Sequence, residues 1–157
     1  MEFTIRNIQP PEYPLLRDFL YEAIFIPKGA APPPKSILDA PELQVYVEHY
    51  GTRKDDMGLI VEVEGQIVGA VWVRVMADYG HLEDGVPSFA LSLYKEYRGQ
   101  GLGTALMKAM LSLLRERGYR RASLAVQKAN YAVRLYQAVG FQTVGETESE
   151  YLMMITL

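Results

Sequence analysis

Short apolar or alternating stretches along the chain predict a protein rich in β-strands. They cover residues 3–8, 57–63, 67–76, 86–94, 122–126, 141–144 and 151–157. Where apolar and polar residues alternate, one face of the strand is apolar and the other polar, which favours a half-buried strand. Glu64-Gly65-Gln66 separates the second and third strands by a tight turn and predicts a hairpin.

Between these strands, apolar residues recur at helical spacing. This spacing predicts helices over residues 15–24, 43–50, 102–114 and 133–139. Gly51, Gly118 and Gly140 follow three of these patterns, in the position where glycine ends helices. The element order is β-α-α-β-β-β-α-β-α-β-β without an internal repeat, and with 157 residues we expect one domain over residues 1–157.

The segment Pro27–Ser36, PKGAAPPPKS, is the one biased stretch of the chain. Its three consecutive prolines favour a stiff, extended conformation. Two interpretations stay open: a connecting loop, or a lid over a substrate pocket.

Composition narrows the classes of function. Hydrophobic residues make up 49% and charged residues 22% of the chain, which is typical of a globular protein with a core. The net charge of -3 argues against a large nucleic-acid-binding surface. The absence of cysteine excludes disulfides, thiolate metal sites and a cysteine nucleophile, and it fits a cytoplasmic protein. With two histidines and no apolar run that spans a bilayer, we expect neither a metal site nor membrane insertion.

The stretch Tyr97–Thr104, YRGQGLGT, stands between a predicted strand and a predicted helix. The first N–H groups of a helix have no partner within the helix, and together with the helix dipole they bind anions such as phosphate. Glycines let a phosphate approach the backbone. The Walker pattern requires a lysine after the last glycine, which is absent here, and the spacing G-x-G-x-G differs from the dinucleotide pattern.

The pattern Arg98-x-x-Gly101-x-Gly103 resembles the acetyl-CoA-binding motif of the GCN5-related N-acetyltransferase (GNAT) family. The surrounding LSLYKEYRGQGLGTALM is similar to that family's strand–loop–helix unit. Asn130 before a helix and the stretch Tyr136–Phe141, YQAVGF, are similar to two further features of the family. The predicted element order agrees as well, so the resemblance extends over essentially the whole chain.

This resemblance implies an α/β (α+β) fold in which four helices flank a mixed central sheet of about seven strands. The sheet is splayed between its fourth and fifth strands. The resemblance also implies acetyl-CoA as cosubstrate, with its pantetheine arm in the splay beside the backbone of Leu91 and Leu93. Its pyrophosphate would lie on the amides of the cofactor loop, which consists of Arg98, Gly99, Gln100, Gly101, Leu102, Gly103 and Thr104.

The resemblance also assigns roles to two residues of the next helix. Asn130 corresponds to a residue that contacts the CoA arm, and a simple helix cap is the alternative. Tyr136 corresponds to the general acid that protonates the departing thiolate, since a phenol is a credible acid for this step. The alternative for Tyr136 is a buried tyrosine of the helix stripe.

The general base and the acceptor site are less defined. Many GNAT members carry a glutamate at the start of the fourth strand, where this chain has Val86-Pro87-Ser88-Phe89. Glu83 is our candidate base, with His81, Asp84 or a chain of waters as alternatives. Candidates for acceptor recognition are Tyr21, Glu22, Phe25, the proline segment, Trp72, Tyr79 and Tyr151, with Glu22 as a candidate anchor for a cationic amine.

The leading hypothesis is therefore an N-acetyltransferase that moves the acetyl group of acetyl-CoA directly to a primary amine in a ternary complex. A catalytically silent acyl-CoA sensor on the same fold and a nucleotide-binding module are the alternatives. The resemblance allows a homodimer, and the sequence does not identify the acceptor.

Overall fold

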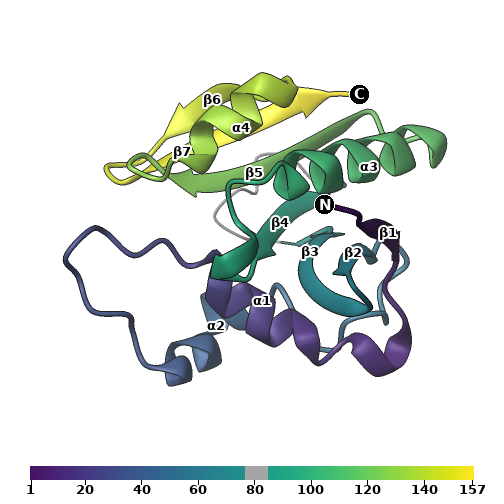
Figure 1. Ribbon diagram of the computed structural model, residues 1–157. Coiled ribbons are helices and arrows are strands. Elements are labelled where there is room, and N and C mark those ends of the chain that lie inside the picture. Colours follow the sequence, from purple (N-terminus) through teal and green to yellow (C-terminus); the bar gives the residue numbers. More distant parts are fainter. Residues whose placement is uncertain (77–84) are drawn as a thin grey trace.

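The computed structural model describes residues 1–76 and 85–157. Its centre is a seven-stranded mixed sheet with the strand order β1-β2-β3-β4-β5-β7-β6 (Figure 1). The strands are β1 (Thr4–Asn7), β2 (Met57–Val63), β3 (Gln66–Arg74), β4 (Ser88–Leu93), β5 (Arg121–Gln127), β6 (Gln142–Glu146) and β7 (Glu150–Thr156). The α-helices of the described residues are α1 (Leu15–Ala23), α2 (Pro41–Gln44), α3 (Leu102–Glu116) and α4 (Ala132–Val139). The predicted fold class is thereby confirmed.

The sheet divides between β4 and β5. Every other neighbouring pair is antiparallel, whereas β4 and β5 run parallel and share a single register pair, Ser88 with Ser123. Beside that pair, the Ser123 N–H donates to the Pro87 carbonyl at 2.9 Å. Beyond it β4 and β5 diverge, so the predicted splay is confirmed and lies toward the carboxyl ends of both strands.

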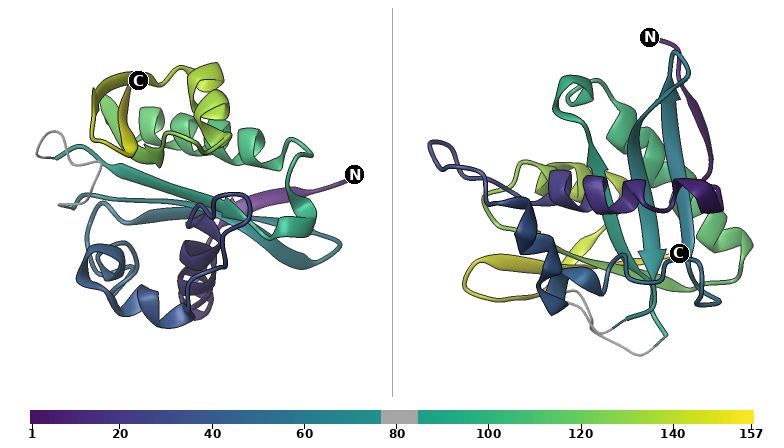
Figure 2. Two further views of the ribbon diagram at one scale, coloured as in Figure 1. Left: turned by 90° about the vertical axis from the view of Figure 1, so that its left-hand side faces the viewer. Right: turned by 90° about the horizontal axis from the view of Figure 1, so that it is seen from below.

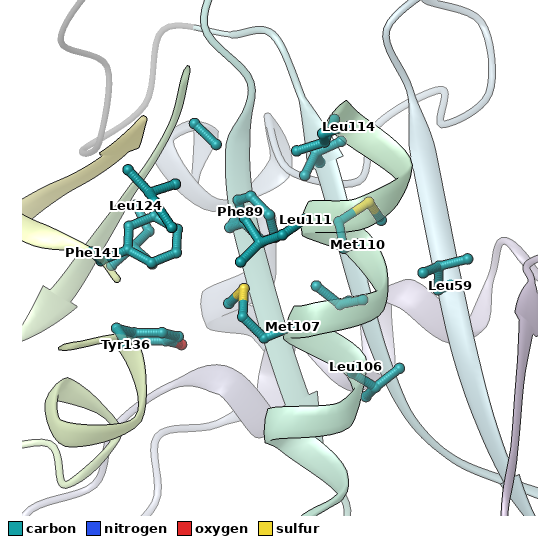
Figure 3. Packing of buried hydrophobic residues seen from close by; sticks show 14 of the residues in the cluster. Leu59, Phe89, Leu106, Met107, Met110, Leu111, Leu114, Leu124, Tyr136 and Phe141 are labelled. Atoms are coloured by element: carbon teal, nitrogen blue, oxygen red, sulfur yellow. The ribbon is translucent and has the colours of Figure 1, made fainter. Parts of the chain in front are cut away.

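Helices cover both faces of the sheet. Figure 2 shows α1 and α2 on one side of β2–β4, with α3 and α4 on the opposite side. Val71 and Val73 of β3 belong to the cluster beneath α3, while Ala70 and Trp72 belong to the cluster beneath α1. Because both faces of β3 are buried over Val68–Val73, this part of the strand is apolar throughout instead of alternating. Figure 3 shows the core on the α3 side, where Leu106, Met107 and Met110 point from the helix into the cluster.

The second helix is shorter than its apolar spacing predicts. We expected it to run to Tyr50, but α2 ends at Gln44 and turns follow. The carbonyls of this stretch accept hydrogen bonds from side chains of β3: Tyr46 from the Trp72 indole, and Val45, Glu48 and His49 from the Arg74 guanidinium. These tertiary bonds replace the last turns of the predicted helix.

Arg74 is fully buried and forms an ion pair with the buried carboxylate of Asp56. Both of its contacts to that carboxylate, from Nε and from Nη2, measure 2.9 Å. With the three carbonyls, the guanidinium uses all five of its N–H donors. Burial alone would raise the pKa of Asp56. Arg74 and the backbone N–H groups of Arg53 and Gly51 outweigh that effect and lower it.

The segment between α1 and the 3-10 helix Lys35–Asp39 contains neither helix nor strand through Pro34 (Figure 1). It is tied back to α1 at one point, where the Tyr21 hydroxyl donates to the Pro33 carbonyl at 2.5 Å. Its predicted role, as loop or as lid, stays a prediction. Among the described residues, no helix has the length and hydropathy needed to span a membrane.

Candidate active site

The cofactor loop has the backbone conformation that its glycines predict. Gly99 and Gly101 have φ of +74° and +87°, in the left-handed region that favours glycine. Gly101 is the N-cap of α3, and its carbonyl accepts the bond from Ala105 N–H at 3.1 Å. Within the described chain, the N–H groups of residues 99–104 donate to no backbone carbonyl. A Cβ placed at Gly99 or Gly101 would meet no atom within 4 Å, so both positions border open space.

The other residues of the loop differ in their surroundings. Gly103 is buried, and a Cβ there would lie 3.2 Å from the Leu135 side chain, so this glycine serves the close packing of α3 on α4. The Leu102 side chain is fully buried, which leaves its N–H as the group available to a ligand. Gln100 is exposed and donates to the Glu96 carbonyl, and Thr104 is half-buried.

Backbone groups of Leu91 and Leu93 face the splay. In antiparallel β3–β4, residues alternate between bonding the partner strand and pointing away from it. The Tyr94 N–H donates to Val68 of β3, and the Pro87 carbonyl accepts from β5. The odd-numbered residues of β4 therefore direct their N–H and carbonyl groups toward β5, which has left the ladder beyond Ser88. Their side chains turn toward α3 and lie 3.9 Å and 3.8 Å from a Cβ built at Gly103.

The Arg98 side chain points to α1. Its Nε donates to the Leu93 carbonyl at 3.0 Å. Its Nη2 donates to the Glu22 carbonyl at 3.1 Å and to the Glu22 carboxylate at 3.4 Å. Three of its possible hydrogen bonds are thus formed within the protein, and the predicted place of Arg98 in the cofactor site stays a prediction.

Asn130 lies directly before Tyr131, the N-cap of α4, and its side chain bonds to the first residue of the helix. Its side-chain oxygen accepts from the Ala132 N–H at 2.9 Å. The residue is half-buried, and the predicted contact to a CoA arm stays a prediction for its amide nitrogen.

Tyr136 of α4 has a buried ring that packs edge-on against Phe141, with ring centroids 6.1 Å apart. Its hydroxyl forms no hydrogen bond within the described part of the chain, yet no side-chain oxygen there is both buried and unpartnered. The hydroxyl therefore reaches solvent, and Figure 3 shows it pointing toward Met107 of α3. Burial, and secondarily Tyr131, raises the pKa of Tyr136 to about 12, so the phenol carries its proton at neutral pH.

A hollow of 260 Å³ lies on the α1 side, lined by Arg17, Asp18, Tyr21, Glu22, Lys35, Leu38 and Tyr94. Three of these, Tyr21, Glu22 and Lys35 of the proline segment, were predicted for acceptor recognition. Tyr94 and Asp18 were missed, although the i, i+4 spacing of Asp18 and Glu22 was a readable signal. Burial and then the charges of Asp18 and Glu22 raise the pKa of Tyr94. Arg17 and Lys35 also line the hollow, so its lining carries charges of both signs. A broader hollow of 520 Å³ over Met1–Thr4 and Glu62–Gly65 shares no residue with the cofactor loop.

The remaining candidates are dispersed. Glu83, His81, Asp84 and Tyr79 lie outside the described residues, so the candidate base is not located. Trp72 is buried in the core beneath α1, Phe25 is half-buried after α1, and Tyr151 of β7 packs beneath Lys128. In residues 1–76 and 85–157, no cluster of three acidic or histidine side chains suits a metal ion.

Comparison with known proteins gives a consistent result. The profile of the Acetyltransferase (GNAT) family matches residues 16–141. N-acetyltransferase 8 from Rattus norvegicus is 34% identical over 94 residues, which cover 59% of this chain and 42% of that protein. The alignment thus spans less than half of that relative.

Two solved structures share the fold over essentially the whole chain. A GNAT-family acetyltransferase from Streptococcus pneumoniae has a TM-score of 0.69 at 22% identity, covering 99% of this chain and 100% of that one. The PaiA N-acetyltransferase from Thermoplasma acidophilum, solved with coenzyme A, has a TM-score of 0.73 at 15% identity and covers 100% of both chains.

Proposed function

The chain belongs to the acetyltransferase (GNAT) family, and on this basis we propose that it transfers the acetyl group of acetyl-CoA directly to a primary amine. The observation that carries the proposal is the cofactor loop: unpaired amides at the start of α3, beside glycines that border open space. Such a helix start suits the pyrophosphate of CoA. The Thermoplasma relative of the same fold was solved with coenzyme A, which supports this choice of donor.

The backbone N–H and carbonyl groups of β4 that face the splay support our proposal that the pantetheine arm lies there. That arm carries amides, and amides pair with strand N–H and carbonyl groups as a further strand would. The Leu91 N–H and carbonyl, together with the Leu93 N–H, are the proposed partners, because Arg98 already occupies the Leu93 carbonyl.

We assign the proton donor to Tyr136. When the amine nitrogen bonds to the thioester carbon and the C–S bond breaks, the departing sulfur needs a proton, which the phenol supplies. A hydroxyl without a protein partner and with its proton retained suits that role. The attacking amine gives up its own proton to Glu83 or to a chain of waters. No acyl-enzyme is required, in keeping with a chain that has no cysteine.

We place the acceptor on the α1 side, in the hollow that ends at Tyr94. Tyr94 directly follows the β4 groups proposed for the donor arm, so the two sites share a boundary. The carboxylates of Asp18 and Glu22 line this hollow and are the proposed partners of a cationic amine.

The test is release of free thiol from acetyl-CoA over a panel of small amines, amino acids and peptide N-termini. We expect turnover with at least one class, and loss of about 10²- to 10⁴-fold in kcat for Tyr136→Phe. Tyr131→Phe is the matched control, because Tyr131 is exposed on the turn before α4. If both variants turned over like the parent protein, Tyr136 would have no part in the mechanism.

A catalytically silent acyl-CoA sensor is the second candidate. The stretch Val86–Phe89 favours it, because it is buried at the start of β4 without a carboxylate. Tight CoA binding in calorimetry, combined with no thiol release over the whole panel, would select this alternative.

A further inference from the structure

Arg98 is shared between the two sites of the proposed function. Its backbone begins the cofactor loop, while its guanidinium reaches across 76 sequence positions to Glu22 in the last turn of α1. Glu22 in turn lines the hollow on the α1 side. One side chain thus joins the proposed donor and acceptor sites.

The contacts have the geometry of a brace. The Leu93 and Glu22 carbonyls, at the ends of β4 and α1, both accept from one rigid guanidinium. The Glu22 carbonyl lies in the last turn of a helix, where carbonyls lack partners within the helix and favour cations. The Arg98 and Glu22 side chains remain 34% and 26% exposed, so the ion pair adds only modest energy and its role is chiefly geometric.

The chain after Glu22 depends on this brace. α1 ends at Ala23, and residues 25–34 after it hold no helix or strand. The Tyr21 hydroxyl of α1 donates to the Pro33 carbonyl of this segment. The hollow is bounded by α1 on one side and by Lys35 and Leu38 beyond this segment. A displaced α1 terminus would therefore alter the hollow from both sides.

We propose that Arg98 is a positioning residue that couples donor binding to the acceptor site, because its backbone belongs to the cofactor loop and its guanidinium holds the end of α1. The inference rests on the proposed function, since it takes the loop as the CoA site and the hollow as the acceptor site. Coupling between two sites is reciprocal, so the acceptor binds more tightly to the CoA-loaded protein and CoA to the acceptor-loaded protein.

The first experiment needs no acceptor. Amide hydrogen exchange of the whole protein is measured with and without CoA, for the parent chain, Arg98→Met and Arg98→Lys. In the parent, CoA should slow exchange in the cofactor loop and also in residues 20–26 and 35–40. In both variants the protection of the loop should persist, while the protection of residues 20–26 and 35–40 is lost. Methionine removes the hydrogen-bond donors, and lysine keeps the charge but cannot donate to both carbonyls as the planar guanidinium does.

The second experiment separates positioning from phosphate binding by steady-state kinetics with the best amine of the panel. Arg98→Met should raise KM for the amine by about three- to tenfold and leave KM for acetyl-CoA within about twofold. Glu22→Gln should raise KM for the amine by less, because it keeps the backbone carbonyl that accepts from Arg98. The double variant should cost no more than Arg98→Met alone, because Arg98→Met already removes the ion pair that Glu22→Gln weakens, together with the bonds to both carbonyls. Arg115→Met, an exposed arginine in the last turn of α3, controls for the lost charge.

Each result has one interpretation. A rise in KM for acetyl-CoA in Arg98→Met, absent from Glu22→Gln, would overturn the proposal and assign Arg98 to the phosphates, through the Nη1 group that makes no hydrogen bond with the described residues. Protection of the loop alone in the parent protein would also overturn it. Absence of any protection by CoA would instead refute the proposed function itself.

Discussion

Tyr136 illustrates how one residue combines a structural and a chemical task. Its ring fills the core beside Phe141, whereas its hydroxyl is left without a partner in the described structure. Removing the hydroxyl should therefore affect chemistry far more than folding. The sequence predicted both properties as alternatives, and the structure shows that a buried ring does not exclude an accessible hydroxyl.

The raised pKa of Tyr136 predicts a pH profile. Because the folded pKa is about 12, above the ordinary value of 10, the phenol stays protonated throughout the usual assay range. In the parent protein, kcat should show no falling limb between about pH 7 and 10. The measurement is kcat against pH with a saturating amine. A falling limb near pH 9 that disappears in Tyr136→Phe would contradict the raised pKa of Tyr136 in the complex, although it would support Tyr136 as the acid.

The raised pKa of Tyr136 also predicts how the stability of the fold changes at high pH. Below pH 10 the phenol is protonated in both the folded and the unfolded chain, and its contribution is constant. Between pH 10 and about 12 the unfolded chain loses this proton first, so stability falls as pH rises. Tyr136→Phe should therefore show a shallower loss of stability above pH 10 than the parent, as measured by urea unfolding.

Arg74 is the residue on which the turns after α2 depend. Arg74→Met should lower the free energy of unfolding by about 3 to 5 kcal/mol, because Asp56 is left buried without its partner. The lowered pKa of Asp56 also makes this contribution depend on pH. The pair stabilises the fold above about pH 4, and the stabilisation is lost as pH falls further.

Urea unfolding at pH 7 and pH 4 measures both effects of Arg74. Arg17→Met, which removes the exposed pair with Asp39, is the control and should cost at most about 1 kcal/mol. Equal losses in the two variants would mean that the buried pair contributes no more than a surface pair.

At the scale of elements, the cofactor loop and the end of α3 offer a matched pair of glycines. Gly101 and Gly118 have φ of +87° and +85°, and at both a Cβ would meet open space. Gly101→Ala and Gly118→Ala should therefore destabilise by a similar amount, about 1 to 2 kcal/mol of backbone strain.

Only Gly101→Ala should weaken CoA binding, by about tenfold or more, because its Cβ enters the space proposed for the phosphates. Unfolding in urea and calorimetric titration of CoA give the two quantities. Unchanged CoA affinity in Gly101→Ala would place the phosphates elsewhere.

Elements with strong local signals were predictable, and those decided by distant partners were not. β2 matches its predicted bounds of 57–63. α3 begins after Gly101, as predicted, because the glycine and the apolar residues at helical spacing mark the same starting point. α2 stops early because Arg74, 25 to 29 positions away, takes the carbonyls of Val45, Glu48 and His49. The bonds from Arg98 to Glu22 were not predicted, because 76 positions separate the two residues and no local pattern marks such a pair.

At the scale of the whole molecule, the split sheet must be held by contacts that cross it. Phe89 of β4 meets Phe141 beside β6, with ring centroids 5.8 Å apart, and Phe141 in turn meets Tyr136. Figure 3 shows these rings beside Met107 of α3. The two halves are therefore joined on the α3 face, while the backbone groups of Leu91 remain available on the side of β5. A ligand between the halves should act as an additional connection.

This arrangement predicts a thermal signature that discriminates between ligands. At about one hundred times its Kd, CoA should stabilise the fold by about 2.7 kcal/mol, which corresponds to a rise in Tm of about 5 to 10 °C for a domain of this size. NADPH and ATP should give smaller shifts, because the loop lacks both the Walker lysine and the dinucleotide spacing. Differential scanning calorimetry with each ligand makes the comparison, with Gly101→Ala to locate the effect. A shift with NADPH alone would refute CoA as the ligand. An equal CoA shift in Gly101→Ala would show that CoA binds away from the loop.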